Sequence, residues 1–327
     1  MTRVLRFLDP YIVLMIATMA IAALLPARGV GAQIAGGAAD AGIIFLFFLY
    51  GARLSPQAAL GGLTHWRLQL AVLLSTYALF PLLGIAVAGL APQSLSSVLK
   101  TGIVFLCLLP STVQSSIAFT SIARGNVPAA LCAASASNIL GVFITPLLAG
   151  WLLQRGGIAL SFDQVTDIVL QLLVPFVAGQ LLRRWIGHWV QDHKAVLSYA
   201  DRGSILLIIY VAFSKGMVDN VWAQIGATDM LLLSVILIGL LTTVLILTYL
   251  IGRKLMRLSI EDEIVLLFCG SKKSLASGLP MATVLFPGPQ LGLLILPLML
   301  FHQLQLIVCA ILARRYGARA GPGPDAA

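Results

Sequence analysis

Lys272 and Lys273 are adjacent cations in a stretch, residues 264–280, that is otherwise uncharged and long enough to cross a bilayer. Lys272 follows Glu263 by nine residues, roughly 14 Å along a helix, so a boundary at Glu263 places both lysines near the membrane midplane. A cation there costs roughly 2.5–3.5 kcal/mol on insertion scales. The two ammonium groups could bind an anion or stand in for a coupling cation. Snorkelling to an interface is the alternative, although a lysine stem reaches only ~6 Å.

Small polar side chains cluster at two places, each directly after a helix-breaking residue. One cluster follows Gly270 and contains Ser271 and Ser274, with Ser277 and Gly278 on the same helical face. The other follows Pro110; its members are Ser111, Thr112, Gln114, Ser115 and Ser116. Backbone groups freed by a broken helix cannot face lipid, so we expect both clusters to line a polar site. Close helix packing through small residues is the alternative for the serines after Gly270.

Two further polar groups interrupt apolar stretches. Ser135 and Asn138 lie in one of them, and a buried amide such as that of Asn138 needs several partners. Interhelical hydrogen bonding would supply such partners and is the alternative to a ligand there. His302 lies in the other stretch and is a candidate proton acceptor, although a lone histidine is more often a satisfied interior residue.

Enzyme chemistry and resident cofactors are not expected. The sequence has no HExxH, GxSxG or P-loop pattern, and its four cysteines lack metal-ligand spacing. All 12 acidic residues fall at predicted span ends, in loops or in the tail, so we expect no membrane carboxylate to neutralise the lysines. Sodium or a proton remains open as a coupling ion, and no metal site is firm.

The composition is that of an all-α polytopic membrane protein. The chain is 59% hydrophobic and 10% charged, whereas a soluble domain carries about a quarter of charged residues. A membrane helix needs about 20 apolar residues. Ten stretches meet or nearly meet that length: 9–26, 40–59, 67–90, 96–123, 127–153, 163–187, 200–218, 229–252, 262–286 and 289–313.

The basic residues predict the orientation of these ten spans. With the N-terminus in the cytosol, fifteen of the 21 Lys and Arg residues fall on the cytosolic side. Only Arg28, Lys100, Arg155 and Lys215 fall on the outer side, and Lys272 and Lys273 lie within the membrane. This bias places both termini in the cytosol and makes the net charge of +9 a topology signal, so no nucleic-acid partner is expected.

The two halves of the chain look related. The fourth and ninth spans carry the two polar clusters, and they cross the membrane in opposite directions because they are five spans apart. Aligning Thr112 with Ser271 places Gln114 on Lys273 and Ser115 on Ser274. Broken helices at matching positions of inverted halves indicate a transporter binding site. We therefore predict repeats at residues 1–153 and 154–315, followed by a disordered cytosolic tail at 316–327.

Residues of the fourth and ninth spans resemble the bile acid/sodium symporter superfamily, and most closely its SBF-like branch. The likeness extends over about residues 5–315. The carrying segments are Asp9-Pro10-Tyr11, Phe47-Phe48-Leu49-Tyr50-Gly51 with Leu54, Leu109-Pro110-Ser111-Thr112-Val113-Gln114-Ser115-Ser116, Ala123-Arg124-Gly125-Asn126 and Gly270-Ser271-Lys272-Lys273-Ser274-Leu275. The resemblance implies a panel domain of spans 1, 2, 6 and 7. It also implies a core domain of spans 3–5 and 8–10, with spans 4 and 9 unwound where they cross.

The chain departs from the sodium-coupled members of that superfamily. Their ninth span carries a glutamate followed by glutamine and asparagine, whereas Gly270–Ser274 contains no carboxylate. A lysine near a cation site repels sodium, so conventional two-site sodium coupling is in doubt and an ammonium could take the place of one ion. Ser115, Ser116, Ser135 and Asn138 match the other sodium site loosely.

We therefore expect a secondary transporter of a small organic, anionic solute that works by alternating access in the cytoplasmic (inner) membrane of a bacterium. Lys272 and Lys273 are expected at its crossing helices, with Thr112, Gln114, Ser115 and Asn138 as polar ligands. The alternative is a membrane regulator or sensor built on a transporter fold, with a channel third. The oligomeric state stays open.

Overall fold

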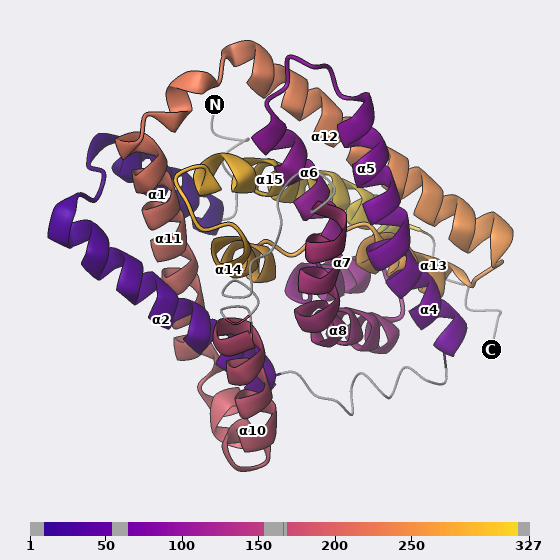
Figure 1. Ribbon diagram of the computed structural model, residues 1–327. Helices are drawn as coiled ribbons and strands as arrows, with labels where there is room; N and C mark the ends of the chain where they lie inside the picture. Colours follow the sequence, from indigo (N-terminus) through magenta and orange to yellow (C-terminus); the bar gives the residue numbers. More distant parts are fainter. Residues whose placement is uncertain (1–9, 54–64, 154–165, 167–168, 320–327) are drawn as a thin grey trace.

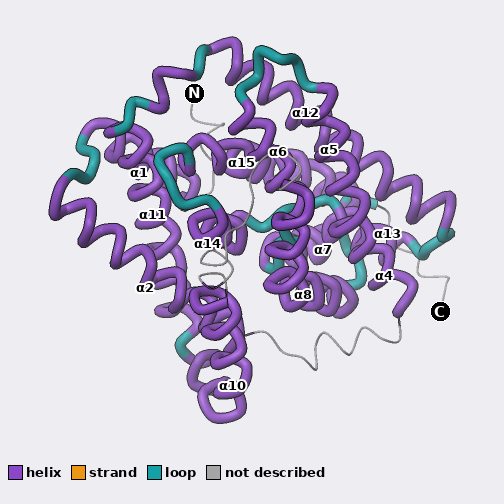
Figure 2. The backbone as a smooth tube through the Cα atoms, in the orientation of Figure 1, coloured by secondary structure: helices purple, strands orange, loops and turns teal. Residues whose placement is uncertain are grey.

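The computed structural model describes residues 10–53, 65–153, 166 and 169–319 (Figure 1). Within this part the regular structure is entirely helical, without strands (Figure 2). The helices are α1 (Pro10–Leu24), α2 (Gly29–Arg53), α4 (Trp66–Leu74), α5 (Phe80–Leu90), α6 (Ser97–Leu108), α7 (Gln114–Ile122), α8 (Val127–Leu153), α10 (Val174–Asp192), α11 (Lys194–Val218), α12 (Ala227–Leu250), α13 (Ile260–Gly270), α14 (Leu275–Leu285) and α15 (Leu291–Gly317). Three π-helical turns adjoin these helices: η3 (Ser75–Leu79) joins α4 to α5, η5 (Val169–Leu173) precedes α10 and η7 (Ile251–Leu255) follows α12.

The protein is a multi-pass membrane protein. Seven of the described helices, counted with their π-turns, are long and apolar enough to cross a membrane. Every one of the ten predicted segments overlaps a helix or a pair of helices. The segments outside the seven are the short helix α1 and the pairs α6–α7 and α13–α14, whose members are individually too short to span.

Both predicted interruptions are present. Helix α6 ends before Pro110 and α7 begins after it, since proline lacks the N–H that a continuing helix requires. Helix α13 ends at Gly270, and α14 starts after Ser274, whose hydroxyl accepts a hydrogen bond from the Ser277 N–H. The two breaks meet, because the Ser274 N–H donates to the Pro110 carbonyl at 2.9 Å. We call residues 109–113 and 271–274 the crossover.

The helices form two packed groups. Helices α1, α2, α10 and α11 pack mainly on one another and occupy the left and lower part of Figure 1. The other helices form the second group, which contacts the first mainly through α11 against α14 and α15. Close approach of α2 and α10 requires glycine: a Cβ on Gly51 would lie 2.1 Å from the Phe176 carbonyl oxygen. A Cβ on Gly179 would lie 2.1 Å from the Phe48 carbonyl oxygen.

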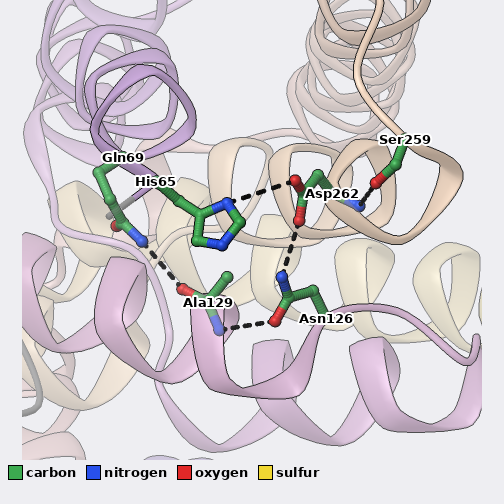
Figure 3. A network of polar contacts seen from close by, with 6 residues as sticks. All are labelled: His65, Gln69, Asn126, Ala129, Ser259 and Asp262. Carbon is green, nitrogen blue, oxygen red and sulfur yellow. Dashed lines mark hydrogen bonds and ion pairs between the residues drawn. The ribbon is translucent and has the colours of Figure 1, made fainter. Parts of the chain in front are cut away.

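Three helix starts in the second group are joined by a polar network (Figure 3). The Asp262 carboxylate at the start of α13 lies 3.6 Å from His65 Nδ1 and accepts from Asn126 Nδ2 at 2.8 Å. Asn126 Oδ1 in turn accepts from the Ala129 N–H in the first turn of α8, and Gln69 of α4 donates to the Ala129 carbonyl. These contacts hold α4, α8 and α13 at one end of the group.

Several predicted boundaries were wrong. Helix α2 begins at Gly29 and α11 at Lys194, so Asp40 and Asp201 lie within helices of spanning length rather than at their ends. The cause is the weakly apolar composition of both helix starts, which a hydropathy criterion assigns to loops. Helix α15 continues to Gly317, and Arg319 donates to the Ala123 carbonyl at 3.0 Å, so the predicted tail begins within the fold. Residues Asp9 and Leu54, as well as 320–327, lie outside the described part.

Candidate functional site

A cavity of about 320 Å³ lies between the two helix groups, beside the crossover. Its volume is at the lower end of the range of ~300–1,000 Å³ for small-molecule sites. Predicted site residues that line it are Thr112, Gln114, Ser115, Asn138, Ser274 and His302. The sequence clusters after Pro110 and Gly270 therefore converge on one chamber, although they are far apart in the chain.

Two helices begin at the wall of this cavity. The first residues of α7 and of α14, including Gln114 and Leu275, line it. N–H groups in the first turn of a helix have no acceptor within that helix and carry the positive end of its dipole. Two such starts facing one chamber favour a negatively charged group there.

Asn138 holds the crossover together. Its amide nitrogen donates to the Ser111 carbonyl at 2.7 Å and to the Ala134 carbonyl at 2.9 Å. Its amide oxygen accepts from the Ser277 hydroxyl at 3.1 Å. The side chain thus joins α8 to both interrupted helices, which is the interhelical role that a buried amide is expected to have.

Other predicted residues lie behind the cavity wall. Ser116 is fully buried and donates to the Phe268 carbonyl at 3.2 Å, which ties α7 to α13. Ser271 is also buried and donates to the Leu267 carbonyl of its own helix. Ser135 is buried in α8 and does not line the cavity. These three serines consequently support the helices rather than face the chamber.

The Lys273 ammonium is enclosed by backbone oxygens. It is fully buried, and its Nζ donates to the carbonyls of Thr76 at 2.9 Å, Cys107 at 2.9 Å and Leu109 at 2.7 Å. The Phe80 ring centroid lies 4.1 Å from the same nitrogen. All three N–H donors of the ammonium therefore have an acceptor, and the lysine does not line the cavity.

Local backbone breaks explain why these carbonyls are available. The Phe80 N–H bonds to Ser75 across the π-turn η3, so it cannot bond to Thr76, and the next residue is Pro81, which has no N–H. The Ser111 N–H, four residues after Cys107, donates to the Ser137 hydroxyl instead. A π-turn and a proline break thus expose main-chain oxygens around one cation.

Lys272 is held differently. It is fully buried, and its Nζ donates to the Ser115 hydroxyl at 3.4 Å and lies 4.3 Å from the Phe119 ring centroid. The Ser115 hydroxyl donates to Thr112 Oγ1 at 2.9 Å. Ser115 therefore stands between the Lys272 ammonium and the chamber, and the ion pairs found among the described residues include neither lysine.

Gln305 of α15 fixes the backbone of the unwound segment. Its Oε1 accepts from the Lys273 N–H at 2.8 Å, and its Nε2 donates to the Lys273 carbonyl at 2.9 Å. The second hydrogen on Nε2 faces His302 Nδ1 at 2.9 Å, so that ring nitrogen acts as the acceptor. If Nδ1 were protonated, its N–H would face the N–H of Gln305 Nε2, which is also a donor. This arrangement argues against His302 as a proton carrier through Nδ1.

The hydropathy pattern did not predict the residues that form the opposite wall of the cavity. Arg53 of α2 and Asp201 of α11 form an ion pair there, and Arg202 lies 5.3 Å from the ring centroid of Tyr11. The Tyr50 hydroxyl donates to the Ala276 carbonyl at 3.1 Å, which links α2 to α14. The hydropathy pattern puts Arg53 and Asp201 at span ends, and their separation of 148 residues gives no local pairing signal.

The helix boundaries also change the register between the two breaks. The alignment predicted from sequence places Gln114 opposite Lys273. Counted from the starts of α7 and α14, the residue that corresponds to Lys273 is Thr112. Gln114 is exposed at the chamber, whereas Lys273 is enclosed, so the two do not have equivalent environments.

Comparison with known proteins identifies the family of this chain. A family model described as the SBF-like CPA transporter family matches residues 9–318. An uncharacterized protein of Pseudomonas aeruginosa is 52% identical over 96% of this chain and 95% of its own length. YfeH of Escherichia coli, whose name proposes a symporter, is 46% identical over 96% and 94%. Sodium/bile acid cotransporter 7 of Mus musculus is 26% identical over 82% and 79%. The chain belongs to the SBF-like CPA transporter family, a family of transporters rather than of enzymes.

Proposed function

We propose that the protein is a secondary transporter of a small organic anion, and that the cavity beside the crossover is its solute site. The observation that carries the proposal is the start of α7 and α14 at the wall of this one chamber. Their first-turn N–H groups and the Lys272 ammonium behind Ser115 together create a positive field for an anionic group.

The two helix groups support movement by alternating access. We propose that α1, α2, α10 and α11 form a panel and that the remaining helices form a core, within ten spans arranged as two inverted repeats. The solute would bind between panel and core, and the Tyr50–Ala276 contact would break when they separate. Positively charged loops favour an inner-membrane orientation with cytosolic termini, in which Arg53 and Arg202 lie toward the cytosol.

Lys273 supports transport without a conventional sodium site. Main-chain carbonyls around a cation are the ligands that sodium would use, and the ammonium already engages three of them. We therefore propose that Lys273 acts as a permanent internal cation. The surroundings of two residues that match a sodium site loosely support this assignment, since Ser135 lies behind the wall and Asn138 is engaged with other protein groups.

The test is a thermal-shift screen of the purified protein in detergent against small monocarboxylates, dicarboxylates, phosphate esters and sulfonates. A ligand that binds the folded state raises the melting temperature according to RT ln(1 + [L]/Kd). We expect organic anions to stabilise the protein and matched neutral esters or amides not to do so. Equal stabilisation by the neutral analogues would contradict an anion site, and absence of any shift would contradict the solute site itself.

A further inference from the structure

The cavity wall formed by α2 and α11 carries an ion pair that is only half bonded. Arg53 Nη1 and Asp201 Oδ2 form the pair. Arg53 Nη2 and Asp201 Oδ1 are buried and have no hydrogen-bond partner among the described residues. The rest of each side chain is partly exposed, at 25% for Arg53 and 14% for Asp201, and both residues line the cavity, so a solute there can meet the charged groups of the pair.

We propose that Arg53 and Asp201 bind the end of the solute remote from its anionic group. This inference rests on the proposed transport function, because it concerns the same cavity. The wall at α7 and α14 would take the anion, and the wall at α2 and α11 would take a second polar group. The solute would thereby contact both helix groups at once.

The ion pair defines the chemistry of that second group, because a guanidinium and a carboxylate both line this wall. It must accept a hydrogen bond from the guanidinium and donate one to the carboxylate, which a hydroxyl or a carboxamide can do. A second carboxylate would be repelled by Asp201, and an alkyl end would cover the two charged groups without offering either of them a hydrogen bond. The inferred solute class is therefore a small organic acid with a neutral hydroxyl or carboxamide at its far end.

A purely structural role for the pair is the competing explanation. Arg53 and Asp201 belong to helices of the same group, so the pair could simply fasten α2 to α11. That role predicts an effect on stability when the pair is replaced, but it predicts no change in which acids bind. The ranking of ligands is thus the readout that separates the two.

The experiment compares acids that differ only at the far end. Full-length protein in detergent is melted with hexanoate, 6-hydroxyhexanoate, adipamate (the monoamide) and adipate, and with the four-carbon series of butyrate, 4-hydroxybutyrate, succinamate and succinate. We expect the hydroxyl and amide acids to bind about tenfold or more tightly than the alkyl and dicarboxylic acids of the same length. In the R53M/D201L variant this preference should disappear or favour the alkyl acid.

Replacement of a buried ion pair by apolar residues of similar size is often tolerated, so R53M/D201L is expected to fold. Asp229→Asn is the control, because Asp229 caps α12 at the Gly226 N–H and does not line the cavity. Binding of all acids without preference, or an unchanged ranking in R53M/D201L, would overturn the inference while leaving the anion site intact. Binding of none of them would overturn the inference, and the anion site falls with it if phosphate esters and sulfonates also fail to bind. If R53M/D201L does not fold, the ranking in Asp201→Asn decides, and an unchanged ranking there overturns the inference.

Discussion

The Lys273 ammonium donates to the Thr76 carbonyl at 2.9 Å, across 197 residues of sequence. The contact exists because the Thr76 carbonyl has neither an α-helical nor a π-helical donor: the Phe80 N–H bonds to Ser75 instead, and Pro81 has no N–H. The helix that supplies this oxygen is thereby locked to the unwound segment that supplies the cation. The π-turn that interrupts the α-helical hydrogen bonds thus also supplies an oxygen that stabilises the buried Lys273 ammonium.

Gln305→Leu should lower the melting temperature strongly. The change removes a donor and an acceptor that satisfy the Lys273 N–H and carbonyl, at about 1–3 kcal/mol for each buried group left unpaired. Gln303→Leu is the control, since Gln303 lies in the same helix and its Oε1 is buried without a partner. Thermal melting in detergent measures both variants. Similar melting temperatures for the two would contradict the role of Gln305 in fixing the Lys273 backbone.

Gly51→Ala should loosen the packing of α2 on α10. The added methyl group would overlap the Phe176 carbonyl oxygen, and backbone cannot move aside as a flexible side chain can. We expect a lower melting temperature and reduced yield of folded protein. In contrast, Gly239→Ala on α12 adds a methyl group with nothing within 4 Å and should be neutral or slightly stabilising. A stable Gly51→Ala protein would show that this contact is less tight than described.

Lys272→Gln should weaken the binding of organic anions. A charge separated from the ligand by one hydroxyl, roughly 6–7 Å, contributes about 2.5 kcal/mol at an effective dielectric of ~20, which corresponds to about seventyfold in Kd. Lys254→Gln in the exposed turn η7 tests for a general charge effect and should leave Kd nearly unchanged. Ligand titrations by thermal shift measure the difference, and equal Kd values for both variants would disprove the role of Lys272.

Sequence was sufficient for the features that depend on local chemistry. Pro110 and Gly270 are helix breakers followed by polar residues, and both breaks occur where these residues predict them. Lys272 and Lys273 were recognisable as costly cations. Their different surroundings were not predictable, because Lys273 is enclosed by oxygens from three distant positions while Lys272 contacts Ser115.

The ion pair in the cavity wall at α2 and α11 could not be predicted from hydropathy. Asp201 lies within α11, but the polar first two turns of that helix hid its position. Arg53 looks like an ordinary basic residue at a helix end. Only the packing of α2 against α11 reveals that the two form one pair at a cavity. An acidic residue flanked by arginine just before a strongly apolar run was the available signal.

We propose that Lys273 takes the place of a bound cation, and the decisive experiment melts the wild type and Lys273→Gln in matched sodium and N-methyl-glucamine chloride. We expect the wild type to melt at the same temperature in both salts. Lys273→Gln should melt several degrees lower without sodium and recover part of the loss when sodium is added, because freed carbonyls can then coordinate the ion. A wild type that sodium stabilises, or a Lys273→Gln protein as stable as the wild type in both salts, would contradict the claim.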